Sequence, residues 1–314
     1  MTLDRLNSYS PAEARQAYEA MQAADGGLKP AQVDRRWIPA RAGEPLATQI
    51  VRPRHPNKLR PGIVYFHGGG WVLGSFQTHE RLVRELAVAT DTAVVVVEYS
   101  RAPEAMFPVA VEQAYSAVSC IAEYGVEFGI ASEGDGSKLA VMGDGVGANL
   151  ATAVAMLAKY RRGPRLSAQI LVSPFLDATA QCQEDSGQPF WEAYSPDAEQ
   201  RKHPMVSPLL ASVGTLRDLP SAFIVTGGRG AARDQGSAYR QKLMQAGVEV
   251  TAASYPDAKH DFLVRNSAAT SSAAKEGLAF AAAAIGRVFA GASGVSPARD
   301  KQYGRKAAYA TCCA

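Results

Sequence analysis

The sequence predicts an α/β fold built on a doubly wound, mostly parallel sheet. Short apolar runs bounded by turn residues recur along the chain, and helical stretches separate them. Most of these runs are apolar throughout rather than alternating, which indicates strands buried on both faces. A regular succession of such strands and helices is typical of a doubly wound sheet.

The chain opens with a predicted helix. Ser10 suits the N-cap, Pro11 suits the first turn, and Glu13 can complete a capping box. The helix is expected to run to about Ala24 and stop at Gly26. Its apolar residues are too sparse for a core helix, so we expect residues 1–45 to form an N-terminal helical lid element.

The core of the fold is expected in residues 46–178 and 220–290. Strands are predicted at residues 62–66, 92–98, 138–142, 168–172, 221–226 and 248–255. Helices are predicted at residues 81–89, 108–124, 148–159, 235–246 and 273–289. Residues 179–219 are rich in proline and aromatic residues and long for a connection, so we expect a lid insertion there. Residues 291–314 are predicted to be a flexible tail.

The composition excludes several classes of function. The 314 residues are 47% hydrophobic, and 33 basic residues nearly balance 30 acidic ones. This balance argues against nucleic acid or an anionic membrane as a partner. The chain opens without a signal-peptide pattern, and its longest apolar run is too short to span a bilayer, so a cytoplasmic protein is expected. The four cysteines fit no zinc pattern, and neither a metal nor a cofactor is predicted.

A run of glycines follows the strand predicted at residues 62–66. His67 is followed by Gly68, Gly69 and Gly70, and then by Trp71. Consecutive glycines allow unusual backbone dihedrals and a close approach to a ligand. Their N–H groups can stabilise negative charge that develops on a carbonyl oxygen. The pattern therefore predicts an oxyanion-binding loop.

Further motifs in the same order identify a resemblance. The chain resembles the hormone-sensitive-lipase family of α/β-hydrolases, which includes bacterial carboxylesterases. The resemblance implies the α/β-hydrolase fold, and it implies an oxyanion hole made by the N–H groups of Gly69, Gly70 and Val146. The residues that carry it lie between about residues 61 and 280; they are residues 67–71, Tyr99, Ala102, Pro103, Glu104, Phe107, Pro108, Gly143, Asp144, Gly147, Ser207, Pro208, Leu209, Tyr255, Pro256, His260 and Phe262.

The resemblance also implies a degenerate catalytic triad. Gly145 occupies the position of the nucleophilic serine, and Gly230 occupies the position of the triad aspartate. His260 remains as a possible acid or base. Glycine has no side chain that could form an acyl-enzyme. Either Asp234 or Asp261 could orient His260, and the sequence leaves that choice open.

Three functions are compatible with these residues. The first is a non-hydrolytic enzyme, a cyclase, lyase, isomerase or carbon–carbon bond-forming enzyme of biosynthesis, which acts on a small apolar carbonyl compound. The second is an inactive, receptor-like protein that binds a small ligand, and the third is a weak or unorthodox carboxylesterase that uses water held by His260. The sequence favours the first and leaves a homodimer open. The expected substrate-binding residues are His67, Gly68, Trp71, Phe190, Trp191 and Tyr194.

Overall fold

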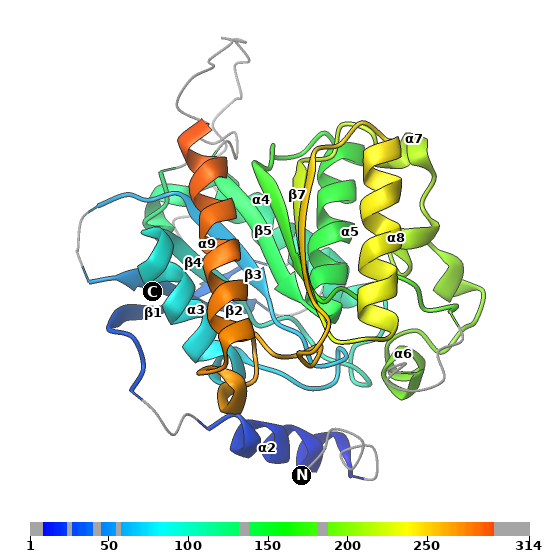
Figure 1. Cartoon of the computed structure of the whole chain (residues 1–314), viewed down its shortest axis with the longest axis horizontal. Helices are drawn as coiled ribbons and strands as arrows, with labels where there is room; N and C mark the ends of the chain where they lie inside the picture. The colour runs from blue at the N-terminus through cyan, green and yellow to red at the C-terminus, as the bar shows by residue number, and fades with distance from the viewer. Residues whose placement is uncertain are drawn as a thin grey trace.

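The computed structural model describes residues 9–23, 27–39, 45–54, 58–131, 138–180 and 188–291. Eight strands of this part of the chain form one sheet in the order β1-β2-β4-β3-β5-β6-β7-β8 (Figure 1). The pairs β1–β2 and β2–β4 are antiparallel, and every other neighbouring pair is parallel. The strands are β1 (Ala31–Ile38), β2 (Leu46–Pro53), β3 (Gly62–Phe66), β4 (Ala93–Val97), β5 (Leu139–Asp144), β6 (Ala168–Val172), β7 (Ser221–Gly227) and β8 (Val250–Tyr255).

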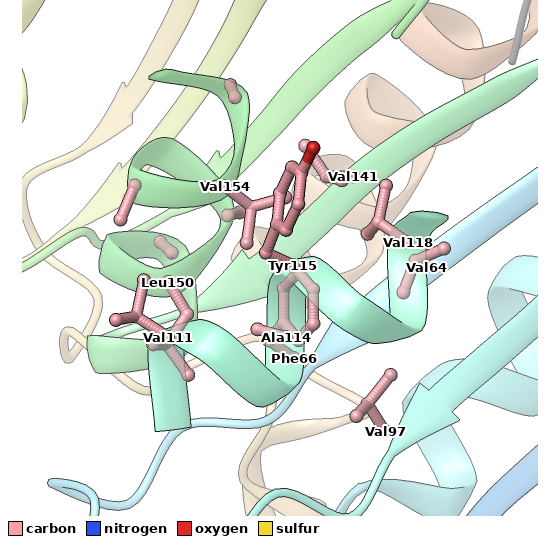
Figure 2. Packing of buried hydrophobic residues seen from close by; sticks show 14 of the residues in the cluster. Val64, Phe66, Val97, Val111, Ala114, Tyr115, Val118, Val141, Leu150 and Val154 are labelled. Carbon is pink, nitrogen blue, oxygen red and sulfur yellow. The ribbon is translucent and has the colours of Figure 1, made fainter. Parts of the chain in front are cut away.

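Helices cover both faces of the sheet, as the doubly wound prediction requires. Successive strand residues point to opposite faces. Val64 and Phe66 belong to the core on the side of α4 (Val109–Glu123) and α5 (Val146–Tyr160), whose packing Figure 2 shows. The intervening residues of β3 belong to a second core beneath α3 (Phe76–Thr90) and α9 (Ser272–Gly291). The remaining elements are α8 (Ala231–Gln245), α7 (Val213–Leu216), α6 (Gln188–Tyr194), η1 (Gly125–Phe128), η2 (Gln200–Lys202), η3 (Pro208–Leu210) and η4 (Asn266–Ala268). No helix within the described residues is both long and apolar enough to cross a bilayer.

The first described helix is α2 (Pro11–Met21), and its predicted start is confirmed. Ser10 and Glu13 form the capping box. The helix ends at Met21, before the glycines at which the sequence predicted its end. Arg15 fastens it to the body of the protein, because its guanidinium donates to the carbonyl of Val72 at 2.8 Å and pairs with Glu104 at 2.7 Å.

The helical lid predicted for residues 1–45 is wrong for residues 31–38. These residues form β1, an edge strand that pairs antiparallel with β2. Polar and charged residues occupy half of β1, and only its two end residues are buried. An edge strand of this kind lacks the continuous apolar pattern from which the central strands were predicted. The predicted tail lies outside the described residues from 292 onwards, as do residues 181–187 of the predicted lid insertion.

Candidate active site

The loops that carry the predicted site residues leave the same edge of the sheet. The carboxyl ends of β3, β5, β6, β7 and β8 are adjacent, since Phe66 pairs with Gly143 and Gly227 pairs with Tyr255. In open α/β sheets this edge is where ligands bind. The glycine-rich loop, the turn at Gly145 and the loop of His260 therefore lie at one edge of the sheet.

The glycine-rich loop has the dihedrals that only glycine adopts freely. Gly69 and Gly70 have φ values of 109° and 63°. A Cβ atom on Gly70 would lie 2.3 Å from the ring of Phe190, so a side chain there would require Phe190 to move. Within the described residues, no acceptor takes a hydrogen bond from the N–H of Gly69 or Gly70. Both groups therefore remain available for an oxyanion.

Asp144, at the end of β5, fixes the glycine-rich loop to the sheet. Its carboxylate accepts hydrogen bonds from the Tyr65 hydroxyl at 2.7 Å and from the Gly68 N–H at 3.0 Å. The Nε2 atom of His79 lies 3.3 Å from it. Burial alone would raise the pKa of Asp144, but His79 and the Tyr65 hydroxyl outweigh burial and hold that pKa below its ordinary value. Asp144 and His79 are thus structural, and the ionised carboxylate braces the loop.

His67 also supports the loop from within. Its ring stacks on Tyr99 at 4.4 Å, and the Tyr99 hydroxyl donates to the His67 carbonyl at 2.8 Å. Burial, helped by nearby His79, lowers the pKa of His67 to about 3, so its imidazole is neutral at pH 7. The side chain is fully buried. In this structure His67 therefore shapes the loop from behind rather than lining a ligand pocket.

The turn between β5 and α5 gives Gly145 a backbone conformation that would strain a residue with a side chain. This residue caps α5 with φ 54° and ψ −117°, and its N–H donates to the Val172 carbonyl at 2.9 Å. A Cβ atom at Gly145 would meet only the Phe175 ring, at 3.9 Å, so the space above it is open. Gly147 brings the first turn of α5 against β3, since a Cβ atom there would lie 2.0 Å from the Phe66 carbonyl oxygen. Val146, the first residue of α5, is thereby held close to the loop that follows β3.

Phe175 is a site residue that sequence reasoning missed. It follows β6, and its ring meets the imidazole of His260 edge-on with the centroids 6.2 Å apart. It therefore lies next to both the open space above Gly145 and the imidazole of His260. A phenylalanine carries no reactive group, so only its place beyond the carboxyl end of a central strand could have drawn attention to it.

The His260 loop packs on the loop that leads into α8. A Cβ atom on Gly228 would lie 3.4 Å from the His260 backbone nitrogen. Gly230 has φ 130°, and a Cβ atom there would meet nothing within 4 Å. Within the described residues, no hydrogen bond joins His260 to Asp234 or Asp261; Asp234 pairs with Arg233 at 2.7 Å. Asp261 forms an ion pair with Arg265.

The aromatic residues of the predicted lid hold α6 against the glycine-rich loop. Trp71 stacks on Tyr194 with a centroid distance of 4.2 Å and contacts Trp191 at 4.4 Å. All three side chains are buried. Phe190 remains partly exposed beside Gly70. Of the aromatic residues expected to contact a ligand, Phe190 alone is therefore partly exposed at the loop, and the others anchor the lid.

Comparison with known proteins places this arrangement in a family. A family model described as the alpha/beta hydrolase fold matches residues 63–264. The chain belongs to the carboxylesterase-like family of α/β-hydrolases. This α/β-hydrolase is 32% identical over 242 residues to a putative alpha/beta hydrolase of Acanthamoeba polyphaga mimivirus, covering 72% of this chain and 68% of the viral protein. It is 33% identical over 272 residues to the ethyl acetate hydrolase of Pseudomonas putida, covering 80% and 82% of the two chains.

Solved structures agree with the sequence relatives. The α/β-hydrolase superimposes on a thermostable esterase from Pseudomonas putida ECU1011 with a TM-score of 0.84 and 36% identity, over 91% of both chains. The two Pseudomonas putida proteins are named as hydrolases of esters. They overturn the expectation of a non-hydrolytic cyclase, lyase or isomerase. The sequence favoured that function because residue 145 has no hydroxyl group that could form an acyl-enzyme. The comparisons support an esterase-like hydrolase instead.

Proposed function

We propose that this chain hydrolyses small carboxylic esters slowly, with water as the nucleophile and without an acyl-enzyme. The observation that supports this most is the turn at Gly145, which has open space and no side chain, while the N–H groups of Gly69 and Gly70 have no acceptor among the described residues. In this proposal, Gly145 stands where the esterase relatives have their serine, and Gly230 stands where they have the acid.

The backbone at Gly145 supports that correspondence. A strand, a sharp turn with positive φ and a helix make up the nucleophile elbow of α/β-hydrolases. Gly145 has this setting between β5 and α5. The elbow strains any residue with a side chain, whereas glycine adopts these dihedrals freely. The ethyl acetate hydrolase among the relatives makes a small ester the natural substrate to test.

The chemistry follows from the groups that remain. The ester carbonyl oxygen accepts hydrogen bonds from the N–H groups of Gly69, Gly70 and Val146. A water molecule above Gly145 transfers a proton to the His260 imidazole while its oxygen bonds to the carbonyl carbon. The tetrahedral oxyanion then collapses, the bond to the alcohol oxygen breaks, and His260 returns the proton to the leaving alkoxide. The products are a carboxylic acid and an alcohol.

The expected rate is modest. Enzymes that lose their triad keep about 10³–10⁴-fold acceleration over water from the oxyanion hole and substrate binding. A general base contributes about 10²–10⁴-fold in favourable cases. His260 lacks an orienting carboxylate among the described residues, so the lower end of that range applies.

The test is hydrolysis of p-nitrophenyl acetate by wild type and two histidine variants. We expect steady turnover without an initial burst, because no acyl-enzyme accumulates. His260→Gln should lower the rate by about 10²-fold. His203→Gln is the matched control, since exposed His203 lies on the lid beside Phe107 and should leave the rate unchanged.

A fluorophosphonate probe completes the experiment. The probe reacts with an activated hydroxyl, so wild type should stay unlabelled while it turns over the ester. Stoichiometric labelling of wild type would reveal another nucleophile and refute the water mechanism. Equal rates for wild type and His260→Gln would refute the role of His260, and binding of esters without any turnover would refute hydrolysis itself.

A further inference from the structure

A cavity of about 440 Å³ lies between the β7–α8 loop and the loop that follows β8. His260 and Phe175 line its inner side, and Gly230 leaves its wall open because no atom lies within 4 Å of an ideal Cβ there. The cavity therefore occupies the space beside His260 where no side chain extends from residue 230. It has room for a small organic ion together with water.

The lining of this cavity is strongly cationic. It includes Arg229, Arg233, Lys259 and Arg265, against the single carboxylate of Asp261. Asp261 is already paired with Arg265. Within the described part of the chain, no carboxylate forms an ion pair with Arg229 or Lys259. The cavity therefore carries positive charge that no described group of the protein neutralises.

Arg233 adds a third donor that a ligand can recruit. Its partner Asp234 is 64% exposed, and Arg233 is 38% exposed. An exposed pair of this kind holds its partners weakly, because water competes for both. The backbone also favours an anion here. The amino end of the 15-residue helix α8 opens on the cavity, and no side chain caps its N–H groups.

We propose that this cavity binds a small carboxylate ion, held by Arg229, Arg233 and Lys259 beside the imidazole of His260. Arginine matches the planar, two-oxygen geometry of a carboxylate and binds it in a bidentate manner. The bound ion faces His260 where neither Asp234 nor Asp261 does, so it can accept the imidazole N–H and set its tautomer. The binding site is independent of catalysis, whereas the effect on ester hydrolysis rests on the proposed function.

The experiment is a formate titration of full-length protein followed by NMR of the His260 imidazole, assigned with His260→Gln. Formate should shift the imidazole signals saturably, and chloride at equal ionic strength should not. The double variant Arg229→Ala/Lys259→Ala should weaken formate binding about tenfold or more. Arg240→Ala/Lys275→Ala is the matched control, since it also removes two positive charges, from exposed positions on α8 and α9 outside the cavity.

A second pair of variants tests occupancy directly. Ala231 lines the cavity in the first turn of α8. Ala231→Asp should suppress formate binding by placing a carboxylate there, whereas Ala231→Asn should bind as wild type does. The absence of a formate shift, an equal shift with chloride, or equal binding by the double variant would each overturn the carboxylate site.

Ester hydrolysis separates this inference from the proposed function. Formate should raise the rate of p-nitrophenyl acetate hydrolysis by wild type with the same half-saturation as the NMR shift, and it should leave His260→Gln unaffected. Saturable formate binding without any hydrolysis would keep the ion site and refute the proposed function. Hydrolysis without formate binding would support the proposed function and refute the carboxylate site.

Discussion

Replacing Gly145 by serine should destabilise the protein even though the new side chain fits. An ideal Cβ atom at this position meets only Phe175, at 3.9 Å, so no overlap contributes. The cost arises from the backbone, whose φ of 54° and ψ of −117° strain a residue with a side chain by about 1–3 kcal/mol. Serine also lowers the conformational entropy of the unfolded chain, which offsets about 0.4–1 kcal/mol of this cost. At the middle of these two ranges, the expected net loss is roughly 1–2 kcal/mol.

Urea unfolding and thermal melts measure this loss. At about 2–4 °C per kcal/mol for a domain of comparable size, Tm should fall by roughly 2–8 °C. Gly145→Ala should lose a similar amount, because the strain does not depend on the hydroxyl. Gly286→Ala is the control: this exposed position in α9 also has open space but no positive φ, and alanine there should stabilise by about 0.4–1 kcal/mol. A Gly145→Ser variant as stable as wild type would refute the strained turn.

Two further predictions concern the residues behind the glycine-rich loop. The pKa of His67 falls from 6.5 to about 3 on folding, so the folded state binds fewer protons between these values. The free energy of unfolding should be highest above pH 6.5 and fall by up to about 1.4 kcal/mol per pH unit as the pH drops toward 3. Urea unfolding of wild type and His67→Gln measures this fall. An NMR signal showing His67 protonated at pH 5.5 would contradict it. Tyr65→Phe should cost about 1.5–3 kcal/mol, because it removes a buried hydrogen bond to ionised Asp144. Tyr194→Phe is the control and should be neutral or stabilising, because the buried Tyr194 hydroxyl has no partner among the described residues. Equal losses of unfolding free energy in Tyr65→Phe and Tyr194→Phe would show that the bond to Asp144 contributes nothing.

Strands β3 to β7 could be predicted because they are buried on both faces and largely apolar, whereas the mostly buried inner strand β2 was missed. The predicted strand at residues 62–66 matches β3, and the glycines that follow it indicated the oxyanion loop. The edge strand β1 was missed because only its ends, Ala31 and Ile38, are buried. Edge strands have fewer buried neighbours, so their sequences carry a weaker pattern.

The site was predictable where a motif specifies backbone geometry and less so where loops meet in space. Gly69, Gly70 and Gly145 have the positive φ values that their motifs require. The cationic cavity was not predicted, because Arg229 and Lys259 lie on different loops and only the packing of those loops brings them together. Burial of Trp71 and Tyr194 depends in the same way on how α6 docks.

Asp144 makes three contacts that hold the glycine-rich loop in shape. None of these contacts depends on which residue stands at position 145, directly after Asp144. The carboxylate ties Tyr65, Gly68 and His79 together without using any atom of residue 145. In the proposed function, the scaffold thus holds the donors for a carbonyl oxygen in place whatever side chain residue 145 carries. A lineage, or a protein engineer, can therefore vary the chemistry at one backbone position while the surrounding architecture stays unaltered.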